Sequence, residues 1–177
     1  MYFKCILSIF FIVIIGKSYS QKTGYKEITV GKNINDSSLN KYRFGVPKGE
    51  DNTFVLVATN DMLFCRIPIN QIIVITDANK KIINIVLLTK EILFRDYSDF
   101  ISSFVKLGTC IIDVVGHSVG SNLEDLNKKN NEIIAAWIFK EENTMMSETA
   151  SNMSAMAKDE LRSFSITWEP YKSTSLW

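Results

Sequence analysis

The sequence predicts an α+β domain, a largely antiparallel β-sheet covered by two or three helices, which follows a cleaved N-terminal signal peptide. Three observations lead to this prediction. The first twenty residues have the layout of an export signal, two β-branched runs flank a short turn in mid-chain, and the predicted strands are joined by both hairpins and helices. Alternating strand–helix–strand units are too few for a doubly wound parallel sheet.

Residues 1–20 read MYFKCILSIFFIVIIGKSYS, in which Lys4 precedes an apolar run and small or polar residues end at Ser20. This is a signal-peptide pattern. The apolar run over residues 5–15 is shorter than the roughly 20 residues that a membrane-spanning helix needs. We therefore expect cleavage after Ser20, no membrane span afterwards, and a periplasmic or extracellular single domain over residues 21–177 with a loosely ordered C-terminal tail.

The charge balance excludes some classes of partner. The chain has 20 basic and 19 acidic residues, and removal of residues 1–20 takes away Lys4 and Lys17 but no acid, which leaves 18 and 19. A chain with no basic surplus lacks the electrostatic basis for binding nucleic acid or an anionic membrane. With one histidine and no CxxC motif, it also predicts no metal site of the zinc type and no cofactor.

A β-hairpin is the clearest predicted element. Residues 69–76 and 81–89 are rich in β-branched side chains and flank the turn Asp77-Ala78-Asn79-Lys80. The run Ile72-Ile73-Val74-Ile75 places apolar side chains on both faces, so we expect this strand to be covered on both sides. Further strands are predicted over residues 25–30, 53–59, 62–67, 110–115, 132–140 and 164–168.

The most regular helix is predicted over residues 96–107. Asp96 is a suitable N-cap, Phe100 and Phe104 lie on one apolar stripe, and Gly108 is expected to follow the last turn. Helical spacing also predicts a helix over residues 147–162. One or two helical turns are expected within residues 35–42, ended by Phe44-Gly45-Val46-Pro47.

Two cysteines, Cys65 and Cys110, remain after the signal peptide is removed. In an oxidising compartment they can pair, and a loop of this length would gain about 3–4 kcal/mol of stability from the bridge. Both lie in apolar runs, so two buried free thiols are the alternative.

The stretch Gly116-His117-Ser118-Val119-Gly120 follows an apolar run and resembles the nucleophile elbow of α/β-hydrolases, which implies a nucleophilic role for Ser118. In that family the catalytic histidine follows the serine and the acid in the chain. The one histidine here, His117, lies inside the motif, and Asp113 has no second acid or base at a diagnostic spacing. We therefore expect a glycine-flanked turn, with Gly116 or Gly120 in a backbone conformation that other residues avoid.

Met153 and Met156 lie one helical turn apart in the helix predicted over residues 147–162. Two thioethers at this spacing can bind Cu(I) in exported proteins. The interpretation that we favour is a soft core-facing stripe that fills irregular space, with no metal site.

Together these features predict an exported, non-catalytic protein of the envelope-associated binding, assembly or immunity type, with a protein partner in the cell envelope. The alternative is a small secreted serine hydrolase that uses the GHSVG turn, with Asp113, His117 and Ser118 as its chemical groups. The sequence leaves the oligomeric state open.

Overall fold

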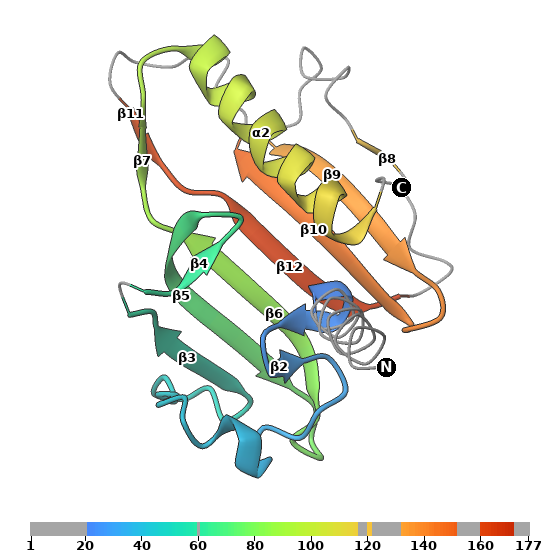
Figure 1. Cartoon of the computed structure of the whole chain (residues 1–177). Coiled ribbons are helices and arrows are strands. Elements are labelled where there is room, and N and C mark those ends of the chain that lie inside the picture. The colour runs from blue at the N-terminus through green and yellow to red at the C-terminus, as the bar shows by residue number, and fades with distance from the viewer. Residues whose placement is uncertain (1–20, 60, 117–119, 122–131, 152–159, 172–177) are drawn as a thin grey trace, which may run out of the picture.

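The computed structural model contains an eight-stranded sheet in the order β3-β5-β6-β12-β10-β9-β8, with β4 paired to β5 (Figure 1). The strands of this sheet are β3 (Thr53–Val57), β4 (Leu63–Phe64), β5 (Ile67–Thr76), β6 (Ile82–Thr89), β8 (Gly120–Ser121), β9 (Glu132–Phe139), β10 (Thr144–Ser151) and β12 (Ser165–Pro170). The described pairs are antiparallel, which confirms the predicted largely antiparallel sheet.

The structure describes residues 21–59, 61–116, 120–121, 132–151 and 160–171. The predicted signal peptide and most of the predicted C-terminal tail lie outside these residues. Within the described ranges, no helix is both long and apolar enough to cross a membrane.

The predicted central hairpin is confirmed by β5 and β6. The Asp77 carboxylate accepts hydrogen bonds from the backbone N–H groups of Asn79 and Lys81, at 2.8 and 2.9 Å, and so fixes the turn. Ile72 is fully buried on one face, whereas Ile73 on the other face is only half-buried. Two-sided cover of this strand is therefore not found among the described residues.

The helix α2 (Tyr97–Val115) lies over β10 and β9 (Figure 1). As predicted, the Asp96 side chain caps it, accepting from the N–H of Asp99 at 2.8 Å. The predicted strand over residues 110–115 is wrong, because the buried stripe continues at Ile111 and Gly108 lies inside the helix. The helix ends at Gly116, whose φ of +102° confirms the expected conformation of that glycine.

The helix predicted over residues 147–162 is also wrong in its described part, since Thr144–Ser151 form β10 and Glu160–Arg162 form β11, which pairs with β7 (Ile92–Phe94). Met146 and Ala150 are both buried on one face of β10. Residues four apart share a face in a strand as well as in a helix, because four is a multiple of the strand period of two.

The N-terminal segment covers the sheet beside α2. The predicted strand over residues 25–30 is instead two short strands, β1 (Gly24–Tyr25) and β2 (Ile28–Thr29), joined by a turn in which Lys26 has φ of +53°. A 3-10 helix, η1 (Ser37–Leu39), follows within residues 35–42, where helical turns were predicted. The indole N–H of Trp168, a fully buried residue of β12, donates to the Gln21 carbonyl at 2.8 Å and fixes the start of this segment.

A disulfide joins Cys65, between β4 and β5, to Cys110 in α2, with their Cα atoms 5.9 Å apart. It connects the helix to the corner of the sheet at which β4 turns into β5. The two cysteines are 45 positions apart, so the bridge closes a long loop in the unfolded chain.

Replacing both cysteines, as Cys65→Ser with Cys110→Ser, is expected to lower the free energy of unfolding by about 3–4 kcal/mol, because the unfolded chain regains its loop entropy. Urea denaturation monitored by tryptophan fluorescence measures the change. The wild-type protein in reducing buffer is the matched control and should unfold at the lower midpoint too. Equal midpoints for wild type and double variant under oxidising conditions would contradict the stabilising role.

Candidate binding pocket

The helix α2 directly precedes the GHSVG motif in the chain. Residues 117–119, including His117 and Ser118, lie outside the described residues, as do Met153 and Met156. The nucleophile elbow needs a strand before the serine, whereas α2 leads into Gly116 here. Asp113 is exposed on α2. Among the described residues, no three His, Cys, Asp or Glu side chains gather as a metal site.

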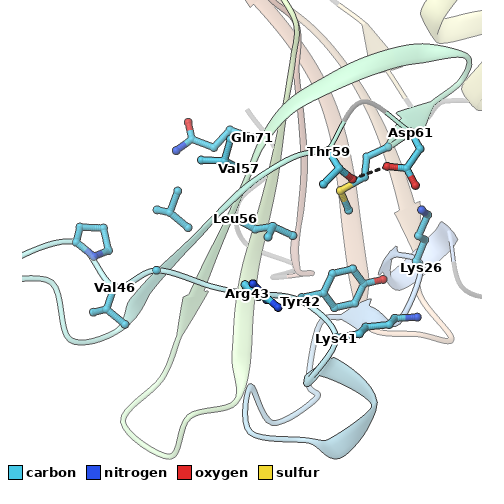
Figure 2. Close-up of a pocket in the computed structure, with 14 residues that line it drawn as sticks. Lys26, Lys41, Tyr42, Arg43, Val46, Leu56, Val57, Thr59, Asp61 and Gln71 are labelled. Carbon is cyan, nitrogen blue, oxygen red and sulfur yellow. Dashed lines mark hydrogen bonds between the residues drawn. The ribbon is translucent and has the colours of Figure 1, made fainter.

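A pocket of about 1070 Å³ lies at β3, the edge strand of the sheet, and we call it the β3 pocket (Figure 2). It is bounded by the segment that precedes β3, by β3 itself and by the start of the connection to β4. Its lining residues are Lys26, Lys41, Tyr42, Arg43, Gly45, Val46, Pro47, Val55, Leu56, Val57, Thr59, Asp61, Met62 and Gln71.

The pocket forms where backbone pairing stops. Gly45 and Val55 exchange two hydrogen bonds, of 2.7 and 2.8 Å, on the side of β3 that faces away from β5. One further antiparallel step would pair Arg43 with Val57. No hydrogen bond joins those two backbones, so the segment diverges from β3 after a single bridge. The space between the diverging chains is part of the β3 pocket.

Val57 consequently has an open backbone edge. The N–H of Ala58 donates to the carbonyl of Asn70 in β5 at 2.9 Å. Successive residues of a strand direct their backbone groups to opposite sides. The N–H and C=O of Val57 therefore point away from β5, and none of the described residues is hydrogen-bonded to them there. Val57 is also 73% exposed.

Lys41, in the lining of the pocket, forms an ion pair with Glu27. Lys41 Nζ lies 2.7 Å from Glu27 Oε1, and the Tyr42 hydroxyl donates to Glu27 Oε2 at 2.5 Å. The hydrogen bonds from Lys41 and Tyr42 lower the pKa of Glu27 to about 2. Burial, together with the Glu27 carboxylate, raises the pKa of Tyr42 above its usual value. Lys41 is thus neutralised by its own partner.

Asp61 and Lys26 lie on the same side of the pocket as Lys41 and Tyr42 in Figure 2. The Thr59 hydroxyl donates to Asp61 Oδ1 at 2.5 Å, and this bond is the main reason that the pKa of Asp61 lies below its ordinary value. Figure 2 shows the Lys26 amino group directed toward Asp61. A carboxylate with a lowered pKa is a weak general base, so the Thr59–Asp61 pair is poorly suited to activating a nucleophile.

Arg43 provides the excess charge. Lys26, Lys41 and Arg43 face Glu27 and Asp61 around the pocket, which leaves one net positive charge. Arg43 is exposed and forms no ion pair or hydrogen bond with the described residues. In Figure 2 it lies beside Tyr42, below Leu56. The pocket therefore contains a guanidinium group that has no counterion among the described residues and lies next to the apolar side chain of Leu56.

The sequence did not predict this pocket. Lys41 and Tyr42 were predicted to lie in short helical turns, and residues 44–47 were predicted only to end them. The basic and aromatic residues over positions 41–44, directly before Gly45, were the available signal, but they give no indication of where pairing with β3 stops.

No protein-family model matches the chain, and no curated protein and no solved structure is significantly similar to it. The geometry of the chain itself therefore carries the functional conclusions.

A second unusual group, Glu148 of β10, lies beneath α2. Its side chain is fully buried, and neither carboxyl oxygen has a hydrogen-bond partner among the described residues. Its neighbours in register, Ala135 and Ile166, are apolar. It faces Gly108, where an added Cβ would lie only 3.1 Å from Glu148 Oε2. Burial raises the pKa of Glu148 to about 9, so it is a neutral acid at pH 7.

Stability is expected to fall as the pH rises from about 4.5 to about 9, because the unfolded chain loses the Glu148 proton and the folded chain keeps it. The loss is on the order of 1 kcal/mol per pH unit. Urea denaturation near pH 5 and near pH 8 measures it. Glu148→Gln, which keeps the shape without the titration, should remove this part of the pH dependence. Parallel pH profiles for wild type and Glu148→Gln would show that Glu148 does not titrate as described.

Proposed function

We propose that this chain is an exported, non-catalytic binding protein that holds a segment of a protein partner of the cell envelope in the β3 pocket. The observation that carries the proposal is the pocket at the open edge of β3, where the backbone groups of Val57 and the charge of Arg43 have no partner among the described residues. An apolar cleft with a few polar groups is the usual form of a binding site. The signal-peptide pattern, and cysteines placed to form a bridge, support a periplasmic or extracellular location.

Binding is favoured over hydrolysis by the chemistry of the pocket and of the GHSVG region. Among the residues that the structure describes, the lining of the β3 pocket contains the hydroxyls of Thr59 and Tyr42 but no histidine and no cysteine. Thr59 donates to a weakly basic carboxylate, and Tyr42 has a raised pKa. The helix before Gly116 also differs from the strand of the hydrolase elbow.

Partner binding predicts a site-specific photo-crosslink. A benzophenone amino acid in place of Val46, a 55% exposed residue at the rim, should crosslink one discrete protein when the source cells are irradiated. The same amino acid in place of Val105, 45% exposed on α2, is the matched control and should give no such product. Mass spectrometry identifies the adduct. Identical adduct patterns from the two positions, or none from Val46, would contradict binding at the β3 pocket.

The hydrolase alternative predicts turnover that depends on Ser118. We expect the wild-type protein and Ser118→Ala to show the same background rate on p-nitrophenyl esters, because a helix and not the strand of a nucleophile elbow leads into Gly116. Turnover lost in Ser118→Ala would favour the hydrolase instead.

A further inference from the structure

The β3 pocket extends around both sides of an edge strand. Val57 pairs across β3 and β5 with Gln71, and these two side chains share the less buried face of the sheet. Leu56 pairs with Ile72 on the buried face. Figure 2 shows Val57 and Gln71 on one side of the β3 ribbon and Leu56 on the other. The pocket has lining residues on both faces of the sheet at this edge. Such a site suits an extended peptide, whose successive side chains point to opposite faces.

The backbone at this edge already pairs with another segment of the same chain, through a single bridge. Gly45 and Val55 form a two-hydrogen-bond bridge, and the next outward-facing residue, Val57, has its N–H and C=O directed into the opening. Unpaired edge groups of this kind are a template for another strand. An extended peptide can use them for main-chain hydrogen bonds while its side chains enter pockets on alternate faces.

The charge of the site selects the chemistry of that peptide. Lys41 is paired with Glu27, and Lys26 is directed toward Asp61. The basic group of the lining that has no counterion among the residues described is therefore Arg43. A guanidinium beside an apolar side chain binds a carboxylate in a bidentate, charge-assisted pair.

We propose that the partner segment is an extended peptide that adds to β3 as an outer strand at Val57 and places an aspartate or glutamate carboxylate against Arg43. This inference rests on the proposed function and specifies the chemistry of the partner at the same site.

The probe is a library of short linear peptides displayed on phage and selected against the purified protein. Enriched sequences are expected to share one acidic residue flanked by β-branched or aromatic residues. Their synthetic, fluorescently labelled forms are then titrated by polarisation. Arg43→Gln should weaken binding by at least about tenfold, the usual size of a charge-assisted contact. Arg95→Gln, an exposed arginine outside the pocket lining, is the matched control and should leave binding unchanged.

A second pair of variants tests the backbone contact. Val57→Pro removes the outward N–H and no bond to β5, so an edge position should tolerate it. It is expected to weaken peptide binding at least as much as Arg43→Gln, whereas Val57→Thr, which keeps the N–H, should bind normally. Equal thermal midpoints for Val57→Pro and Val57→Thr establish that both variants are folded.

Several results would overturn strand addition. These are the absence of enriched peptides, enrichment without an acidic residue, and binding that is unchanged in both Arg43→Gln and Val57→Pro. A stable dimer in sedimentation that Val57→Pro dissociates would also overturn it, because the occupant would then be a second copy. The Val46 crosslink tests the proposed function separately. If Val46 gives a discrete adduct together with any of these results, partner binding is supported and only the addition of a strand is contradicted.

Discussion

An antiparallel sheet must bury one face and protect both of its edges, and this constraint accounts for most of the structure. The helix α2 and the N-terminal segment cover one face side by side. The Cys65–Cys110 disulfide and the hydrogen bond from Trp168 to Gln21 attach these two covers to the sheet. At the β3 edge, the bridge between Gly45 and Val55 gives only partial protection. The proposed binding surface is the part of that edge that stays open.

The fit of α2 on the sheet depends on a glycine and a neutral acid. Glycine within a helix costs about 1 kcal/mol relative to alanine, so Gly108 needs a packing reason. Glu148 supplies one, since a Cβ at Gly108 would lie only 3.1 Å from its carboxyl oxygen, closer than an ordinary contact. Because the acid is buried without a hydrogen-bond partner among the described residues, it is retained in the protonated form. This buried group therefore links the packing of the helix to pH.

The sequence predicted the elements that depend on local chemistry. Asp77 defines the β5–β6 turn and Asp96 caps α2, and both roles are readable from a few neighbouring residues. The predictions from sequence were wrong where tertiary packing determines the secondary structure. Gly108 looked like a helix end because its partner Glu148 is forty positions away, and residues 147–162 looked helical because their apolar spacing of four fits both periods. The pocket depends on where pairing with β3 stops, which no local pattern encodes.

The most direct measurement of the central claim is amide hydrogen exchange of the free protein, resolved by NMR at Val55 and Val57. Val55 N–H is bonded to the Gly45 carbonyl at 2.8 Å, whereas no described residue accepts from Val57 N–H on the same edge. Slow exchange at Val55 with fast exchange at Val57 is the predicted result, because bonded amides are protected and open edge amides are not. Equal, strong protection at both residues would contradict the account, since the edge would then be closed.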